Sequence, residues 1–574
     1  GHGEYRLKYP MKLVDGKYQK ISWDEALDAI TKKMLALREE NGPDSVFFIG
    51  SSKHNNEQSY LLRKWVSMWG TNNTDHQARI CHSTTVAGVA NTWGYGAMTN
   101  SYNDMQNTKC ALYIGSNAAE AHPVSVLHML HAKETGAKMI VVDPRFTRTA
   151  ARADEYVRIR SGSDIPFLFG MLYHIFKNGW EDKKYINDRV YGMDQIKADV
   201  MANWTPDKVE EACGVNEAQM YKVAEMMAKN RPSTLVWCMG QTQHSIGNAM
   251  VRASCIVQLA LGNIGVSGGG ANIFRGHDNV QGATDVGPNP DSLPGYYGVA
   301  EGSWKHWCRV WGVDYEWIKS RYAEGMSTKA GMTVSRWVDG VLENPELIDQ
   351  KAGNLRGLFF WGHAPNSQTR GLDMKKAMDK LDLLVVIDPY PSATASMAAM
   401  PGDPAGLNPN REVYLLPAAT QFECSGSCTA SNRSLQWREK VIEPMFDSRT
   451  DHMIMYQLAE KLGFADEFSR SHTLVKGKGG MMEPEMESVL KEINKGTWTI
   501  GYTGQSPERL KLHMKNMHTF NVRTLKAEGG PCDGDYFGLP WPCYGTADIK
   551  HPGSPNLYST EKSVMDGGGN FRAN

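Results

Sequence analysis

The chain has 574 residues, a mass of 63.9 kDa and a nearly balanced charge, with a formal net charge of −1 and a pI of about 7.1. This length is sufficient for several domains, each with its own core. The balanced charge gives no electrostatic reason to expect nucleic acid or an anionic lipid surface as a partner. No apolar run is long enough to span a bilayer.

Short apolar runs recur along the chain and end abruptly in Gly, Asp or Asn. They are rich in β-branched and aromatic residues, which is typical of strands buried on both faces of a parallel sheet. The runs lie at residues 45–51, 110–117, 138–145, 234–241, 357–366, 383–390 and 412–419.

Helical patterns alternate with these runs. In SWDEALDAITKKMLAL, Leu27, Ile30 and Met34 fall on one face, and Ser22 with Glu25 matches a capping box. The alternation predicts α/β architecture with more than one doubly wound sheet, whose ligands bind beyond the carboxyl ends of the strands. No GxGxxG follows a strand, so a simple NAD-binding fold is not indicated. Further helices are expected at 163–178, 247–262 and 451–463.

Two stretches have no regular pattern. Residues 265–300 are rich in Gly, Asn, Asp and Pro and are expected to form a long ordered loop, which in a compact enzyme is usually functional. From about residue 465 the pattern fades, and the proline-rich segment 538–558 is expected to be an extended wrapping segment.

The motif RICHSTTVAG (79–88) places Cys81 directly before His82 and a predicted helix. Adjacent side chains project apart, so the pair does not form a nucleophile–base dyad of the thiol-protease kind. A thiolate near a helix N-terminus is stabilised by the helix dipole and suits a soft metal ion. The alternative is a buried, inert thiol.

A second motif, NIFRGHDNVQGATDVG (272–287), has Arg275 among Gly, Asn, Asp and Gln. The planar guanidinium could bind a carboxylate bidentately. The alternative is a solvated loop with an ordinary surface arginine.

Polar residues cluster at the ends of the predicted strands. Asp143 could bind ribose hydroxyls and Asp164 the edge of a base such as guanine, with Asn117 and Ser163 as further hydrogen-bonding partners. A similar set follows the later strands, at 361–368, 387–395 and 421–433. Two similar sets suggest two related nucleotide-like sites. The remaining cysteines have no metal-ligand spacing and are expected to be structural thiols, among them Cys110, Cys238, Cys255, Cys308, Cys424 and Cys428.

Together these features resemble the molybdopterin oxidoreductases of the dimethyl-sulfoxide-reductase type, from ISWDEALDAI (21–30) to the segments PWPCYGT and HPGSPNLY (540–558). Within that family, RICHS and RGHDNVQG resemble formate dehydrogenases. Periplasmic nitrate reductases also use a cysteine ligand but lack the histidine directly after it. WTPDKVEEACGV (204–215) and PWPCYGT are most similar to the catalytic subunits of respiratory, often periplasmic, formate dehydrogenases.

The resemblance implies two doubly wound, Rossmann-like αβα domains with discontinuous chain tracing. The first would comprise residues 1–80 and 276–465 and the second residues 81–275, followed by an irregular extension over 466–574. The family usually adds an N-terminal module with a 4Fe–4S cluster and a C-terminal β-rich domain. The sequence matches neither, so we expect a central region of a larger subunit.

The resemblance also implies molybdenum or tungsten held by two molybdopterin guanine dinucleotides, with Cys81 as metal ligand. His82 would be a proton acceptor or electrostatic stabiliser beside the metal, and Arg275 would hold the carboxylate of formate. The dinucleotides would be lined by Asn117, Asp143, Arg145, Gly162, Asp164, Gly240, Gln241 and Gly362.

The implied reaction is oxidation of formate to carbon dioxide. The implied partners are an iron–sulfur electron-transfer subunit and a membrane cytochrome subunit, and the implied location of this chain is the periplasm. Two alternatives remain: another molybdenum enzyme, such as one that reduces nitrate, or a non-catalytic structural subunit of the same fold. The sequence leaves open which metal is bound, what accepts the electrons and which direction the reaction takes in the cell. It also leaves open whether hydrogen leaves formate as a hydride or as a proton with separate electron transfer.

Overall fold

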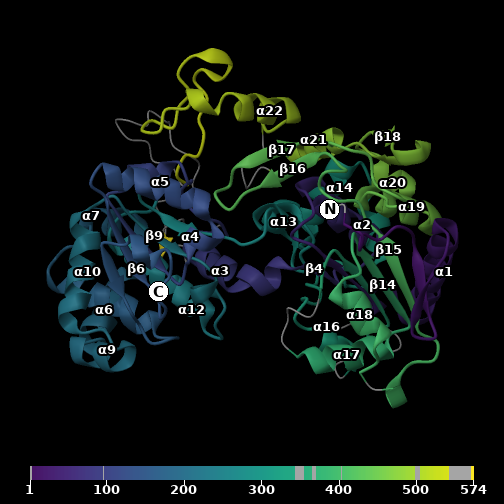
Figure 1. Ribbon diagram of the computed structural model, residues 1–574, viewed down its shortest axis with the longest axis horizontal. Coiled ribbons are helices and arrows are strands. Elements are labelled where there is room, and N and C mark those ends of the chain that lie inside the picture. The colour runs from purple at the N-terminus through teal and green to yellow at the C-terminus, as the bar shows by residue number, and fades with distance from the viewer. Residues whose placement is uncertain are drawn as a thin grey trace. The chain divides into compact units, whose positions relative to one another are not determined.

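The computed structural model describes residues 3–94, 96–342, 354–364, 370–402, 404–497, 504–541 and 571–574. The contacts divide the chain into two compact units (Figure 1). Unit 1 consists of Gly1–Ile80, His277–Thr429 and Leu435–Lys511, and unit 2 of Cys81–Gly276, Ala430–Ser434 and Leu512–Asn574. Each unit is therefore assembled from separate pieces of the chain.

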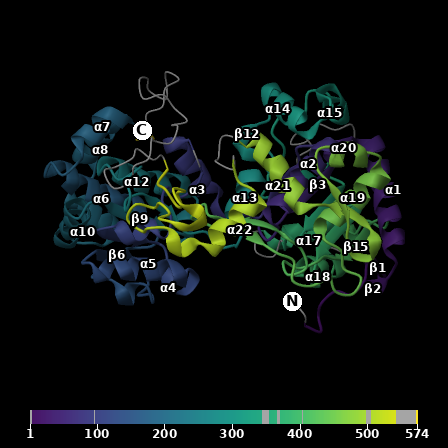
Figure 2. The same ribbon diagram turned by 90° about the horizontal axis from the view of Figure 1, so that it is seen from above.

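Unit 2 is built on a parallel sheet of five strands in the order β10-β9-β5-β6-β7. The strands are β5 (Cys110–Ile114), β6 (Lys138–Val142), β7 (Glu155–Val157), β9 (Ser233–Trp237) and β10 (Ala271–Ile273). β5 and β9 are buried along their whole length, as expected for central strands with helices on both faces, and the edge strand β10 is buried as well. Figure 2 shows α4 (Ala118–Ala121) and α5 (Pro123–Glu134) on one face, and α6 (Asp164–Lys177) and α12 (Gly247–Ala260) on the other.

The other elements of unit 2 surround this layered core. They are α3 (Ala78–Trp93, whose first three residues belong to unit 1), α7 (Lys183–Arg189), α8 (Met193–Asn203), α9 (Pro206–Cys213), α10 (Glu217–Lys229), α11 (Met239–Thr242), β8 (Val190–Tyr191) and β20 (Phe571–Arg572).

Unit 1 contains a seven-stranded sheet in the order β2-β1-β15-β14-β13-β3-β4. Its strands are β1 (Met11–Val14), β2 (Lys17–Lys20), β3 (Val46–Gly50), β4 (Thr74–His76), β13 (Gly357–Trp361), β14 (Leu383–Asp388) and β15 (Glu412–Pro417). Strands β15, β14, β13, β3 and β4 run parallel, whereas β1 and β2 add an antiparallel edge.

Helices cover both faces of this sheet because successive side chains of a strand point to opposite sides. Phe48 and Phe359 pack in the cluster formed with α1 (Trp23–Asn41), α2 (Asn56–Trp69) and α19 (Asp451–Leu462). Their neighbours Phe47 and Leu358 pack in the cluster formed with α16, α17 and α18. The remaining bounds are α13 (Val280–Val286), α14 (Glu301–Trp311), α15 (Tyr315–Arg321), α16 (Trp337–Leu342), α17 (Gly371–Lys380), α18 (Ala393–Ala399), α20 (Ala465–Ser469), α21 (Met486–Gly496), α22 (Pro507–Lys515), and the hairpins β11 (Ser292–Leu293)–β12 (Tyr297–Gly298), β16 (Gly426–Thr429)–β17 (Leu435–Arg438) and β18 (Leu474–Lys476)–β19 (Met482–Pro484).

The predicted α/β class is confirmed, and each of the seven predicted strands lies in one of the two large sheets. The capping box predicted for α1 is confirmed in its first half, because the Ser22 hydroxyl accepts a hydrogen bond from the Glu25 amide at 3.1 Å. None of the described helices combines the length and the apolar character that crossing a membrane requires.

Two predictions about irregular stretches were wrong. Residues 265–300 are not one loop, since they contain the three-residue strand β10 and the seven-residue helix α13. Both are too short to show a periodic pattern in sequence. The predicted extension from residue 466 contains the regular helix α21, and the chain as far as Lys511 belongs to unit 1. Most of the predicted wrapping segment, residues 542–558, lies outside the described residues.

Candidate active site

Cys81 and His82 lie at an interruption in α3. The backbone of His82 (φ −134°, ψ 16°) is not helical, so the helix consists of two segments that meet there. Cys81 therefore precedes the N-terminus of the segment that continues to Trp93, where the helix dipole favours an anionic thiolate. The cysteine is 4 % exposed and the histidine is fully buried.

Side-chain contacts hold this part of α3 against the chain that follows β9. The Thr84 hydroxyl donates to the Thr242 carbonyl oxygen at 2.6 Å. The Cys81 Sγ lies 3.9 Å from the Met239 Sδ, two residues beyond the end of β9. Cys81 is thereby placed at the carboxyl end of a central strand, which is the ligand-binding edge of a parallel sheet.

Arg275 lies two residues beyond the end of β10, the parallel neighbour of β9, and so at the same edge of the sheet. It is 2 % exposed. Its Nη2 donates to the Gly96 carbonyl oxygen. Its Nε and Nη1 have no hydrogen-bond partner among the residues that the structure describes. The alternative of a surface arginine in a solvated loop is therefore wrong.

A second buried arginine, Arg63, provides a comparison, because each of its side-chain nitrogens has a hydrogen-bond partner. In Arg63 of unit 1, Nε donates to the Ser292 carbonyl at 3.1 Å, Nη1 to the Ser67 hydroxyl at 2.7 Å and Nη2 to the Asn72 side chain at 2.9 Å. Leaving a charged group unpaired in the interior is costly. One Nη2 hydrogen of Arg275 is donated to the Gly96 carbonyl. The other Nη2 hydrogen and a hydrogen on Nε or Nη1 can together donate two parallel hydrogen bonds to an anion.

The predicted cofactor-binding residues after β5 and β9 lie side by side. The Gly240 amide donates to the Gly115 carbonyl at 3.1 Å. A Cβ atom at Gly240 would lie 2.7 Å from the Gly115 Cα, so the two backbones approach more closely than any side chain permits. Two residues on, the Asn117 side chain accepts a hydrogen bond from the Thr149 hydroxyl at 3.0 Å.

This close approach yields a prediction for Gly240→Ala. The added methyl group must displace the Gly115 loop, and overpacking of this kind costs about 1–3 kcal/mol. We expect a lower melting temperature and a reduced pterin content in the full-length protein. Gly302→Ala is the control, because a Cβ there has no atom within 4 Å. Unchanged stability and pterin content in the Gly240 variant would contradict the predicted role of this loop.

Of the two predicted acidic residues, Asp143 directly follows β6 and Asp164 is the first residue of α6. Asp143 is half-buried, and one carboxylate oxygen accepts from the Arg145 amide at 2.9 Å while the Arg145 side chain is exposed. Asp164 is buried, and desolvation raises the pKa of its carboxyl group. His244 and the Gln241 side chain act against this rise. Gly162, exposed and with φ +83°, forms the turn before α6.

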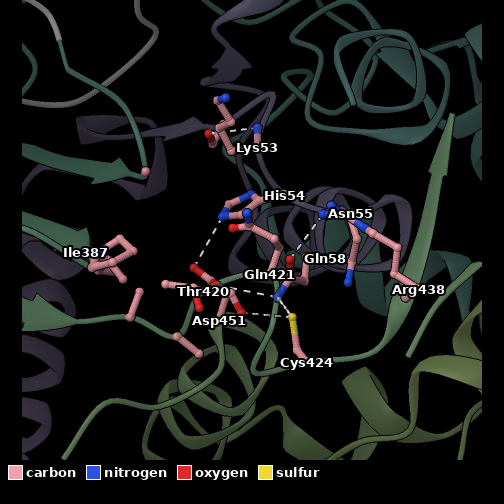
Figure 3. A pocket seen from close by; sticks show the side chains of 16 residues that line it. Lys53, His54, Asn55, Gln58, Ile387, Thr420, Gln421, Cys424, Arg438 and Asp451 are labelled. Carbon is pink, nitrogen blue, oxygen red and sulfur yellow. Dashed lines mark hydrogen bonds and ion pairs between the residues drawn. The ribbon is translucent and has the colours of Figure 1, made fainter. Parts of the chain in front are cut away.

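Gly362 is the one predicted site residue that belongs to unit 1. It lines a pocket beyond the carboxyl ends of β3, β13, β14 and β15 (Figure 3). Parts of the three later polar segments of the sequence meet here, since Gly362, Pro389 and Gln421 all line this pocket. Residues 365–368 lie outside the described residues.

The polar groups of this pocket are organised around Asp451. Its carboxylate lies 3.2 Å from the His54 Nε2 and accepts a hydrogen bond from the Trp361 Nε1 at 2.6 Å. Figure 3 shows Gln58 and Cys424 beside it and Arg438 on the other side of Asn55. The pocket therefore offers an anionic acceptor, an imidazole and a cation, which suit the base, sugar and phosphate groups of a nucleotide.

The other cysteines follow the prediction of structural thiols, with one correction at Cys238. Cys110, Cys255 and Cys308 are buried, and burial raises the pKa of each thiol. Cys238 is not a core thiol, because it is half-buried beside the site. Its Sγ lies 2.7 Å from the Phe274 carbonyl oxygen. Cys424 lines the unit 1 pocket.

Comparison with known proteins identifies the fold and family. The family model described as "Molybdopterin oxidoreductase" matches residues 6–461. The chain belongs to the molybdopterin oxidoreductase family. Acetylene hydratase from Pelobacter acetylenicus has the same fold, with a TM-score of 0.65 and 21% sequence identity over 88% of this chain and 66% of that one.

Relatives within the family are formate dehydrogenases. The chain is 31% identical to the F420-dependent formate dehydrogenase subunit alpha of Methanocaldococcus jannaschii, over 99% of this chain and 72% of that protein. It is 32% identical to formate dehydrogenase H of Escherichia coli, over 82% of this chain and 62% of that protein. This molybdopterin oxidoreductase is therefore a formate-dehydrogenase-like enzyme, and its family implies a pterin cofactor that carries molybdenum or tungsten.

Several residues of the site were missed by sequence reasoning. Lys53 and His54 follow β3 directly, so the rule that found the other strand-end clusters could have found them. In unit 2, Met239 lies in the predicted run 234–241 but was not assigned a role. In the unit 1 pocket, Arg438 and Asp451 carry no local signal. They reach the pocket from segments that are distant in the chain and are brought together only by folding.

Proposed function

We propose that the chain carries the active site of a formate dehydrogenase catalytic subunit, which oxidises formate to carbon dioxide. The observation that carries this proposal is the buried Arg275 guanidinium with its open two-point fork, at the same sheet edge as the Cys81 thiol. A carboxylate is planar and matches such a fork. The names of the relatives support the same substrate.

The proposed cofactor is molybdenum or tungsten with two molybdopterin guanine dinucleotides and Cys81 as the protein ligand. A thiolate at a helix N-terminus suits a soft metal ion. Each unit offers polar residues at the carboxyl ends of its sheet. In unit 2 the buried Asp164 carboxyl could accept hydrogen bonds from a guanine edge, and in unit 1 the pocket around Asp451 offers comparable groups. When bound, the metal–pterin cofactor supplies the redox chemistry.

The residues of the chain supply binding, orientation and proton handling. Removing two electrons and one proton from formate breaks its C–H bond. Arg275 would bind the carboxylate and direct the C–H bond away from its own fork. Because Cys81, His82 and Arg275 are buried, water is excluded and charged hydrogen bonds are strong. His82, next to Cys81 in the chain, would take up the proton or stabilise charge.

Electrons would leave through a 4Fe–4S cluster to an iron–sulfur subunit and, in a respiratory complex, to a membrane cytochrome subunit. The chain itself would lie in the periplasm. The support is the resemblance of residues 204–215 and of PWPCYGT (540–546) to respiratory formate dehydrogenases.

A dye-linked assay of the full-length protein tests the proposal. We expect formate to reduce an oxidised viologen, and nitrate not to oxidise the reduced dye. Nitrate turnover without formate turnover would contradict the proposal and favour an oxyanion reductase. An absence of both activities in protein that contains metal and pterin would also contradict it.

A further inference from the structure

Arg275 belongs to a short segment whose backbone is held at almost every polar group. The Phe274 amide donates to the Trp237 carbonyl at 3.0 Å, which continues the β10–β9 ladder. The Phe274 carbonyl lies 2.7 Å from the Cys238 Sγ. Burial raises the pKa of the Cys238 thiol to about 11, so it stays protonated and can donate. The Arg275 amide donates to the Ser431 hydroxyl at 3.0 Å.

The remaining polar group, the carbonyl of Arg275, accepts a hydrogen bond from the Ser431 hydroxyl at 3.2 Å and a shorter one from an imidazole. The His122 Nε2 lies 2.6 Å from the Arg275 carbonyl oxygen. A carbonyl oxygen only accepts, so the Nε2 must carry the hydrogen. Burial lowers the pKa of His122, and the neutral ring with its hydrogen on Nε2 is therefore the donating form at neutral pH.

His122 is itself fixed. It lies between α4 and α5, where its amide donates to the Ala118 carbonyl at 2.8 Å and its carbonyl accepts from the Ser125 hydroxyl at 2.7 Å. Its ring also packs against the Phe274 ring, with 5.3 Å between the centroids. The Phe274 ring in turn meets Tyr102 edge-on at 5.1 Å. The imidazole is thus a rigid support and not a mobile side chain.

We propose that His122 is a positioning residue for the substrate-binding arginine, holding the Arg275 backbone so that the open fork of its guanidinium meets the substrate in one geometry. The inference rests on the proposed role of Arg275 in binding formate. Bidentate recognition depends on distance and angle at both nitrogens, so a small displacement of the Arg275 backbone weakens it. His122 touches neither the substrate nor the cofactor in this proposal, and it acts through the carbonyl that it binds.

The proposal is tested with His122→Leu and His122→Gln in the full-length enzyme. Leucine removes the donor, whereas the glutamine amide can replace the Nε2 hydrogen. For His122→Leu we expect kcat/KM for formate to fall about 10- to 30-fold, mainly through a higher KM, as loss of one buried hydrogen bond suggests. Glutamine should restore the value to within about threefold of the wild type. His131→Leu, at an exposed position on helix α5, which begins directly after His122, is the control.

A second readout does not depend on turnover. Hydrogen exchange of the peptide that contains residues 272–276 should be about tenfold faster in His122→Leu and near the wild-type rate in His122→Gln. Unchanged exchange would overturn the proposal, whatever the substrate is. Faster exchange with an unchanged KM for formate would show that the contact is structural only, which also overturns it. If the wild-type enzyme does not oxidise formate, the proposed function fails while the exchange data still decide whether His122 holds Arg275.

Discussion

Replacing Cys81 with alanine in the complete enzyme should abolish formate oxidation, with a loss of at least about 1,000-fold, while the fold remains intact. The size of the effect follows from removing the one side chain proposed to ligate the metal, which supplies far more than a single hydrogen bond. The measurement is steady-state dye reduction with formate, together with circular dichroism and the melting temperature. Substantial retained turnover would argue against metal ligation by this residue.

Cys110→Ala is the matched control. Cys110 is also a buried thiol, but it lies at the first residue of β5, whereas the site lies beyond the carboxyl ends of the strands. The same atoms are removed from a buried position, so a comparable loss of stability is expected in both variants. Turnover should fall only in the Cys81 variant. If both variants lose activity equally, the loss would reflect the fold and not the metal.

Replacing Arg275 with lysine should raise the KM for formate about 10- to 100-fold. Lysine keeps the positive charge but loses the planar fork, and a hydrogen bond to a charged group contributes roughly 1.5–3 kcal/mol. The KM should change more than kcat if the interaction is made to substrate and transition state alike. An unchanged KM would remove Arg275 from the substrate site.

Arg63→Lys distinguishes substrate binding from the general effect of altering a buried arginine. Each nitrogen group of Arg63 already has a partner in the chain. Its replacement should lower the melting temperature without changing the KM for formate. A similar rise of KM in both variants would indicate that the effect is transmitted through stability.

The fold could be predicted from the sequence because its central strands are continuous apolar runs. Runs such as CALYI and LLVVI are buried along their length, and that burial on both faces is what requires uninterrupted hydrophobicity. β10 could not be predicted in this way. It has three residues and contains the polar Asn272, whose side chain donates to the Thr234 hydroxyl. Its strand character comes from pairing with β9, which is a tertiary property.

Residues of the candidate site could be predicted only where a short sequence motif contains them. Cys81 with His82, and Arg275 in its glycine-rich segment, are visible in the sequence as unusual residue combinations. The sequence left open whether Arg275 is a surface residue, since its polar neighbours suit a solvated loop equally well. The burial that decides this comes from elements far along the chain, such as Ser431 and His122, which no local pattern associates with Arg275.

Elemental analysis with pterin release, made on the full-length protein, tests the central claim most directly. We predict molybdenum or tungsten, together with a guanine-containing pterin, in the wild-type protein, and a greatly reduced metal content in Cys81→Ala. Wild-type protein that folds normally but contains neither metal nor pterin would contradict the account, and the chain would then be a structural member of the family without a catalytic centre.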